Sequence, residues 1–164
     1  MTPILRNALR LLVLLCAAGA ALSARAADTE PAPAPRAARD TLAAARALVA
    51  KSNWPGAIAE LRRVNDTRNA DWHNLMGFAH RQQAVPDLAT AERHYDEALR
   101  LDPQHRGALE YSGELHLMKG NLAAAQARLQ ALDKACAASC EEYADLKKAV
   151  AAYQANGNRP LKAP

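Results

Sequence analysis

Aromatic residues are scarce in this sequence. Only 4% of its 164 residues are aromatic and a single one is Phe, although 50% are apolar. Ala and Leu supply much of the apolar share. Ala favours helices because it loses no side-chain entropy in them, and its small size lets neighbouring helix axes approach closely. The composition therefore predicts an all-α fold.

Catalytic sequence motifs are absent as well. The chain contains no G-x-x-x-x-G-K-[ST] loop, no G-x-S-x-G elbow, no H-E-x-x-H pair and no C-x-x-C-H motif. These absences remove the sequence support for nucleotide hydrolysis, serine hydrolysis, zinc-dependent proteolysis and covalent haem binding. We therefore expect no enzymatic activity and no cofactor.

The longest apolar run lies at the N-terminus and predicts an export signal. Arg6 and Arg10 supply the positive start, residues 11–22 form the apolar segment, and Ala24 and Ala26 are the small residues that a signal peptidase reads. The run is shorter than the roughly 20 residues of a membrane-spanning helix. We expect residues 1–26 to be cleaved near Ala26, so that the mature protein is periplasmic or secreted and meets a membrane only through the signal.

Cys16 leaves a lipid anchor as an alternative to cleavage near Ala26. A lipoprotein signal needs a small residue before the cysteine, and Leu15 is large. Cleavage is therefore the favoured interpretation. Residues 27–37 are rich in Pro and Ala and predict a flexible linker, so that the folded part begins near Ala38.

An excess of positive charge is also lacking once the signal is removed. The formal charge of +4 includes Arg6, Arg10 and Arg25, and without them 18 basic residues face 17 acidic ones. Binding to nucleic acid needs clustered Lys and Arg that displace the counterions of the phosphates. We therefore expect no nucleic-acid partner.

What the sequence does contain is a repeat of constant length. Four apolar columns recur at one fixed interval along the chain, and within a unit they stand three or four positions apart, on one face of a helix. The columns are Trp54, Leu88 and Leu122; Ala57, Ala91 and Ala125; Leu61, Tyr95 and Leu129; and Val64, Ala98 and Leu132. A polar residue that can cap a helix precedes each first column: Asn53, Asp87 and Asn121. The pattern predicts three helices that begin at equivalent points of successive units.

Each of these helices is preceded by a segment with a small residue at its centre. The small residues are Ala45, Gly77 and Gly113. Because Gly inside a helix costs about 1 kcal/mol, we expect it to allow close contact between the two helices of a pair. Together with "EALRLDP" at 97–103, the pattern resembles the tetratricopeptide repeat, a helix-turn-helix unit of about 34 residues.

The resemblance implies a right-handed superhelical solenoid of helix pairs that ends in a capping helix. Leu146, Val150 and Tyr153 would cover the last pair, and Gly157 would end the cap. The expected segments are three repeat units at about 38–69, 70–105 and 106–135, a Cys-bearing junction with the capping helix at 136–155, and a flexible tail at 156–164.

The resemblance also implies a function. Stacks of this kind bind an extended peptide or a partner helix in a concave groove, lined mainly by the first helix of each pair. We therefore expect a non-catalytic adaptor for a protein or peptide partner, with ordinary solvated charges on helix faces as the alternative interpretation of the same positions. The implied groove positions are Arg39, Leu42, Arg46, Val49, Asn74, Phe78, Arg81, Glu110, Glu114 and Leu117.

Cys136 and Cys140 are the only cysteines that follow the signal. Thiols this close are normally joined in an oxidising compartment, so the favoured interpretation is a structural disulfide that sets the angle of the capping helix. A copper-binding or redox-active pair and two unpaired thiols are the alternatives. The copper-binding or redox-active pair would make the chain a thiol- or metal-handling factor.

Two histidines occupy equivalent positions in successive repeat units. His80 and His116 each stand three positions after a glycine, and His73 lies seven positions before His80 on the same helix face. Equivalent positions of stacked helices lie near one another, which makes a shared ligand site conceivable. We interpret these side chains as half-buried packing groups instead and expect no metal site.

Overall fold

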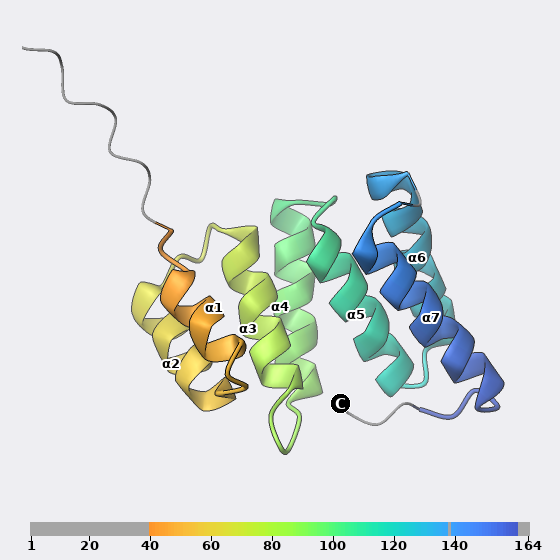
Figure 1. Cartoon of the computed structure of the whole chain (residues 1–164), viewed down its shortest axis with the longest axis horizontal. Helices are drawn as coiled ribbons and strands as arrows, with labels where there is room; N and C mark the ends of the chain where they lie inside the picture. Colours follow the sequence, from red (N-terminus) through yellow and green to blue (C-terminus); the bar gives the residue numbers. More distant parts are fainter. Residues whose placement is uncertain (1–39, 138, 161–164) are drawn as a thin grey trace, which may run out of the picture. The chain divides into compact units, whose positions relative to one another are not determined.

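The computed structural model describes residues 40–137 and 139–160, and within them it contains seven α-helices and no strand (Figure 1). The helices are α1 (Ala43–Val49), α2 (Trp54–Val64), α3 (Ala70–Arg81), α4 (Leu88–Leu101), α5 (Arg106–Met118), α6 (Leu122–Cys136) and α7 (Glu141–Ala155). The all-α prediction is confirmed for these residues. The predicted signal with Cys16, the linker, Arg39 and residues 161–164 of the tail lie outside the described residues.

The predicted spacing of helix starts is confirmed. Helices α2, α4 and α6 begin at Trp54, Leu88 and Leu122, which are the three members of the first apolar column. Their caps are equivalent too, because the side chains of Asn53, Asp87 and Asn121 each accept a hydrogen bond from the backbone N–H three positions later, at 3.0, 3.0 and 3.1 Å. A local sequence rule therefore sets the start of each of these helices.

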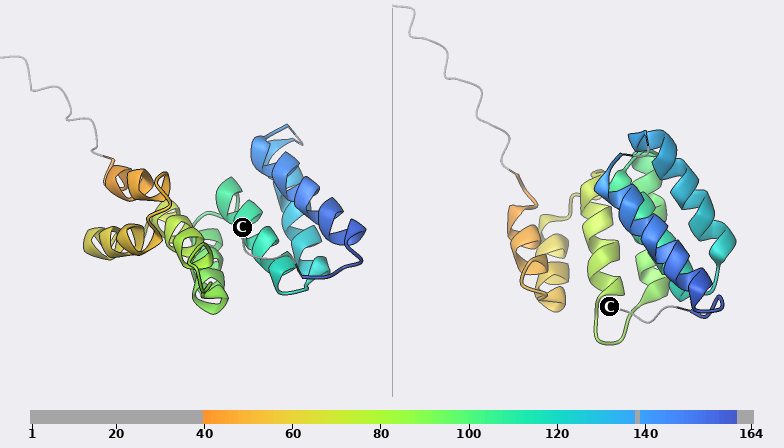
Figure 2. Two further views of the ribbon diagram at one scale, coloured as in Figure 1. Left: turned by 60° about the horizontal axis from the view of Figure 1, so that its bottom comes forward. Right: turned by 45° about the vertical axis from the view of Figure 1, so that its right-hand side comes forward.

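The helices are arranged in two sets. Each helix packs against the next one in the chain, and the odd-numbered helices also pack on one another, α1 on α3, α3 on α5 and α5 on α7. Figures 1 and 2 show α1, α3, α5 and α7 as one row. In the view of Figure 1, α2, α4 and α6 lie behind this row. We refer to the first set as the odd-helix row. Its side chains provide the candidate site described below.

Small residues permit this close packing. Ala57, Ala91 and Ala125, which form the second apolar column, are all 0% exposed. A Cβ added to Gly77 would lie 2.6 Å from Cε1 of Tyr95, so the glycine lets α3 approach α4, its partner in the pair, as expected. Gly113 differs from the prediction, because its added Cβ would lie 2.5 Å from Cδ2 of Leu146, in α7 rather than in α6.

The buried apolar side chains form three groups along the chain. The first joins α1, α2 and α3, and Trp72 at its edge donates its indole N–H to the carbonyl of Leu61 at 2.7 Å. The second consists of Ala91, Tyr95 and Leu115 from α4 and α5. The third joins α5, α6 and α7. Each group therefore belongs to helices that are close in sequence.

Helix α7 covers the end of this arrangement in the way that the sequence predicts. Leu146, Val150 and Tyr153 are 0%, 6% and 2% exposed, whereas the intervening Lys147 and Lys148 are exposed. The helix ends before Gly157, whose φ of +69° lies in the left-handed region that glycine adopts without steric cost.

The junction between α6 and α7 carries the two cysteines. Cys136 is the last residue of α6, and Cys140 is the N-cap of α7. Their sulfur atoms lie at disulfide-bonding distance, and their Cα atoms are 5.7 Å apart. Ala137 between them adopts a left-handed conformation with φ of +46°. The bridge therefore ties the end of one helix to the start of the next.

A loop formed by residues 82–87 connects α3 to α4. Its base is closed by a hydrogen bond from the N–H of Asp87 to the carbonyl of His80 at 3.1 Å. Val85 in this loop is 85% exposed. The loop extends past the ends of the helices that it joins (Figure 1).

Candidate functional site

Three of the few aromatic side chains form a line across three helices. Trp54 of α2 contacts Phe78 of α3 edge to face, with ring centroids 5.8 Å apart, and Phe78 contacts Tyr111 of α5 at 4.7 Å. All three residues are half-buried, so part of each remains available to solvent. We call Trp54, Phe78 and Tyr111 the aromatic row. Phe78 and Tyr111 belong to the odd-helix row, and Trp54 of α2 extends the line of rings beside it.

Arg81 lies against the aromatic row. Its guanidinium carbon is 5.5 Å from the centroid of Phe78 and 5.4 Å from that of Tyr111, and its Nη1 donates to Oε2 of Glu114 at 2.7 Å. The side chain of Arg81 is only 3% exposed. A buried guanidinium is tolerated here because two ring faces and one carboxylate replace its hydration. Nε of Arg81 and the hydroxyl of Tyr95 are enclosed and have no hydrogen-bond partner.

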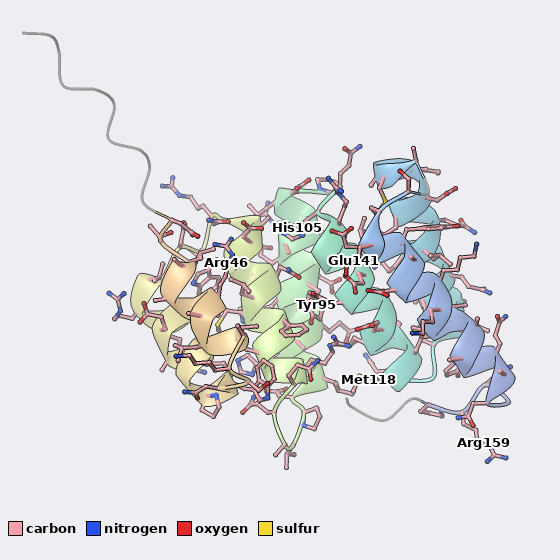
Figure 3. All side chains as sticks on the ribbon, viewed as in Figure 1. Arg46, Tyr95, His105, Met118, Glu141 and Arg159 are labelled. Atoms are coloured by element: carbon pink, nitrogen blue, oxygen red, sulfur yellow. A yellow bond between two sulfur atoms is a disulfide. The ribbon has the colours of Figure 1, made fainter. Side chains whose placement is uncertain are left out.

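Next to Arg81 lies a group of carboxyl groups from two helices, Glu110 and Glu114 of α5 and Glu142 and Asp145 of α7, which we call the acidic cluster. The contact of Leu146 with Gly113 brings α7 against α5, and the charges of Glu114, Asp145 and Glu142 all act on Glu110. Figure 3 shows α7 beside α5, with Glu141 labelled at its first turn.

Glu110 is the most buried member of the acidic cluster. It is 8% exposed, and it makes no hydrogen bond or ion pair within residues 40–137 and 139–160. Burial, followed by the neighbouring carboxylates of Glu114, Asp145 and Glu142, raises the pKa of Glu110 to about 8, against a smaller opposing effect of Arg81. Desolvation and like charges both disfavour the ionised form, so this carboxyl group is largely protonated at neutral pH.

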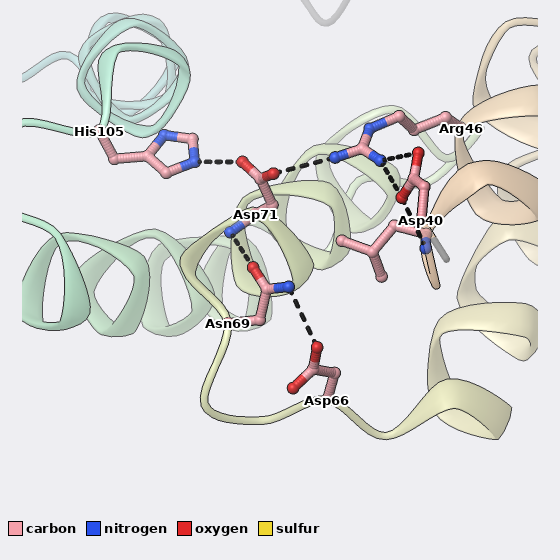
Figure 4. A network of polar contacts seen from close by, with 7 residues as sticks. Asp40, Arg46, Asp66, Asn69, Asp71 and His105 are labelled. Carbon is pink, nitrogen blue, oxygen red and sulfur yellow. Dashed lines mark hydrogen bonds and ion pairs between the residues drawn. The ribbon is translucent and has the colours of Figure 1, made fainter. Parts of the chain in front are cut away.

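A second polar network joins α1, α3 and the start of α5 (Figure 4). Nη2 of Arg46 donates to Oδ2 of Asp71 at 2.9 Å, while its Nη1 pairs with Asp40 at 2.7 Å. His105 caps α5 by accepting the N–H of Ala108 at its Nδ1, 3.1 Å away. Since Nδ1 accepts, Nε2 carries the proton that His105 donates to Oδ1 of Asp71 at 2.9 Å. Asp71 of α3 therefore links α1 to the start of α5.

An open hollow lies beside this network. Its lining is mostly polar and contains Asp71, Asp102, Gln104, His105, Arg106, Gly107, Ala135 and Glu142. Asp71 and His105 are already engaged with each other there. Two of the polar side chains that line the hollow therefore already serve to link helices.

Three histidines meet between α3 and α4. Nε2 of His73 lies 3.0 Å from the carbonyl of Thr67 and must donate to it, which leaves Nδ1 of His73 to accept from Nδ1 of His94 at 3.0 Å. The ring of His80 stacks on that of His94 with centroids 6.1 Å apart, and its Nε2 is enclosed without a partner. Burial first, and then the charges of His73 and His80, lower the pKa of His94 to about 4.

This histidine group agrees with the packing interpretation of His73 and His80, which are both 7% exposed. Sequence reasoning missed His94, which lies on the second helix of the pair and belongs to no apolar column. In the part of the chain that the structure describes, no group of three or more His, Cys, Asp or Glu side chains is placed to hold a metal ion.

The structure brings five of the predicted groove residues to neighbouring positions on α3 and α5: Asn74, Phe78, Arg81, Glu110 and Glu114. Arg46 is exposed on α1, but its guanidinium is engaged by Asp40 and Asp71. Val49 is half-buried and packs against the first core group.

Three of the predicted groove residues require correction, and one of them is Arg81, whose 2% exposure leaves it almost no surface for a partner. Leu42 is 2% exposed and Leu117 is 0% exposed, because both side chains point into the helix interfaces of the core. They present no surface to a partner. Four further residues of the site, Trp54, Tyr111, Glu142 and Asp145, were not among the predicted groove positions. Trp54 was recognised only as a member of the first apolar column. The position of the α7 carboxylates depends on the contact between Gly113 and Leu146, which the repeat pattern does not specify.

No protein-family model matches the sequence, and no curated protein is significantly similar to it. Among the helices that the structure describes, none is long and apolar enough to cross a membrane. The function of the chain must therefore be inferred from the odd-helix row itself.

Proposed function

We propose that this chain is an exported, non-catalytic scaffold of the tetratricopeptide-repeat type, which binds an extended peptide or a helix of a partner protein along the odd-helix row. The observation that carries the proposal is the aromatic row, whose three rings are each partly accessible. Partly accessible aromatic rings are among the side chains that most often dominate the energy of a protein interface.

The helix arrangement supports the repeat assignment. Three equivalent caps recur at a constant interval, and α1, α3, α5 and α7 pack on one another while α2, α4 and α6 lie behind them. A right-handed solenoid would present the odd-helix row on its concave side, which is the side that binds partners in such stacks.

In this proposal the cysteine pair has a structural role. The disulfide joins Cys136 to Cys140 and so holds α7, which carries Glu142 and Asp145, against the rest of the row. The competing function is thiol or copper chemistry at this pair. In that case, binding of copper or of a redox partner would require the cysteines and not the aromatic row.

The proposal can be tested by photocrosslinking in the native host. Benzoylphenylalanine placed at Tyr111 should capture a partner protein, whereas the same group at the exposed Val85 should not. The purified partner should then bind wild-type protein in calorimetry, and a Phe78→Ala/Tyr111→Ala variant with an unchanged circular dichroism spectrum should bind about tenfold or more weakly. Equal capture from both positions, or equal affinity of the variant, would refute the proposed binding surface.

A further inference from the structure

We propose that the partner segment inserts a lysine or arginine side chain into the acidic cluster, where it pairs with Glu110. This inference rests on the proposed function, because it specifies the chemistry of the segment that binds the odd-helix row. It assigns to Glu110 the role of a selectivity residue for a cationic partner.

The acidic cluster contains four carboxyl groups and faces one guanidinium, that of Arg81. Helix α3 contributes this guanidinium. The Nη1 of Arg81 already pairs with Glu114 at 2.7 Å, and its guanidinium carbon lies over the rings of Phe78 and Tyr111. The other three carboxyl groups, those of Glu110, Glu142 and Asp145, have no ion pair with any residue that the structure describes. Burial and the neighbouring carboxylates keep Glu110 protonated at neutral pH, so a second cation is the group that would allow it to ionise.

Glu110 is placed to receive that cation. At 8% exposure it is removed from most of the solvent, so an ion pair made there would be screened little. The fully enclosed polar atoms without partners, among the residues described, belong to Asn74, His80, Arg81 and Tyr95 and not to Glu110. A ligand can therefore still reach its carboxyl group from outside.

The ring of Tyr111 adds a contact for the same cation. Tyr111 is half-buried and forms the end of the aromatic row on α5, and the nearby charge of Glu110 contributes, after burial, to the raised pKa of its hydroxyl. A side chain with a long apolar stem and a cationic end can lie along such a ring and still reach a carboxylate. Lys and Arg have this shape, whereas an apolar or acidic side chain would leave Glu110 unpaired.

The affinity for a cation should depend on pH in a defined direction. The charged groups that act on Glu110 are Glu114 of its own helix, Arg81 of α3, and Glu142 and Asp145 of α7. Without a ligand they and burial hold the pKa of Glu110 at about 8. A bound cation favours the ionised carboxylate, so it should lower this pKa, and the affinity should rise as pH increases through that range.

The first experiment uses N-acetylarginine methylamide and its norleucine counterpart as probes of the full chain. The carboxyl carbon of Glu110 is followed by NMR during a pH titration and is assigned with Glu110→Gln. The arginine compound should lower the pKa of Glu110, and the norleucine compound should leave it in place. An equal pKa with and without the arginine compound would overturn the inference.

The second experiment uses an array of extended peptides of equal length whose central residue is Arg, Lys, norleucine or Glu. Peptides with Arg or Lys should bind about tenfold more tightly than norleucine peptides. Glu110→Gln should abolish this preference and its pH dependence, while Glu141→Gln, which removes an exposed charge at the start of α7, should retain both.

The outcomes separate the two proposals. Peptide binding without any preference for Arg or Lys overturns the cationic site and leaves the scaffold function standing. A shift of the pKa of Glu110 by the arginine compound, without binding of any peptide, supports the cationic site and argues against the scaffold function.

Discussion

At the scale of single residues, the contact between Gly77 and Tyr95 determines how closely α3 and α4 pack. On an exposed helix Gly→Ala would stabilise by about 1 kcal/mol. Here the added Cβ would lie 2.6 Å from a ring that is 0% exposed and cannot move away. We expect Gly77→Ala to lower the free energy of unfolding by about 1–3 kcal/mol, measured in urea.

The matched substitution for comparison is Gly107→Ala in the first turn of α5. Its added Cβ would approach Nδ2 of Asn74 at 3.0 Å, and the end of an amide side chain can shift more easily than a buried ring. A smaller loss is expected at Gly107. Equal losses at the two glycines would contradict the assigned role of Tyr95.

The pH dependence of His94 gives a second prediction at this scale. The folded-state pKa of about 4 lies below the ordinary value of 6.5, so the folded protein binds fewer protons than the unfolded chain between these values. The stabilisation from neutral His94 is therefore complete above about pH 6.5 and is lost as pH falls toward 4. The full shift corresponds to about 3 kcal/mol, and solvent screening of the half-buried ring reduces this value, so the difference in unfolding free energy between wild type and His94→Gln should shrink by about 1–2 kcal/mol over this range.

Glu110 makes the comparison with His94→Gln necessary. Its raised pKa means that the folded state binds more protons than the unfolded chain between the ordinary value of 4.5 and about 8, which favours folding at low pH. This contribution is common to both proteins and cancels in their difference. A difference that stays constant between pH 7 and 4.5 would show that His94 does not titrate as described.

Individual residues differ in how far the sequence could predict their roles. Asn53 and Asp87 were predictable because a cap needs only the backbone N–H three positions later. Burial of Leu42 was not, because it depends on how α1 is rotated against α2 and α3. The contact of His94 with His73 arises from packing between two helices, which no local pattern records.

At the scale of helices, the turn between α6 and α7 contains a residue that does not suit its backbone. Ala137 has φ of +46° and ψ of +42°, a conformation that costs an L-residue with a Cβ roughly 1–2 kcal/mol. We expect Ala137→Gly to stabilise the protein by about 0.5–1 kcal/mol in thermal or urea unfolding. Ala127→Gly, at an exposed position inside α6, should instead destabilise by about 1 kcal/mol.

The disulfide at the same turn gives the second prediction for the helices. Joining residues four positions apart removes little freedom from the unfolded chain, so the bridge is worth about 2 kcal/mol. A Cys136→Ser/Cys140→Ser variant should melt at a lower temperature with the same helix content. Reductant should lower the melting temperature of wild type but not of the variant, and an equal response of both would contradict a stabilising bridge.

At the scale of the described chain, the separation of the core into three groups predicts uneven stability. Leu61 belongs to the group of α1 to α3, and Leu132 to the group of α5 to α7. Leu61→Ala should remove hydrogen-exchange protection mainly from α1 and α2, and Leu132→Ala mainly from α6 and α7. Equal loss of protection along all helices in both variants would mean that the three groups unfold as one.

The order of helices was predictable at this scale, because the constant period of the apolar columns fixes where α2, α4 and α6 begin. The position of α7 relative to α5 was not. It depends on the contact between Leu146 and Gly113, and the cap lies beyond the last repeat. The acidic cluster is a product of that contact, which explains why half of it was missed.

The loop between α3 and α4 has a consequence for how this protein can be altered. A hydrogen bond from Asp87 to His80 closes the loop at its base, and Val85 beyond it makes little contact with the helices. Added residues at such a tip change neither packing nor backbone pairing, and lengthening a loop costs little entropy. A fluorescent reporter inserted at Val85 should therefore leave the helices in place.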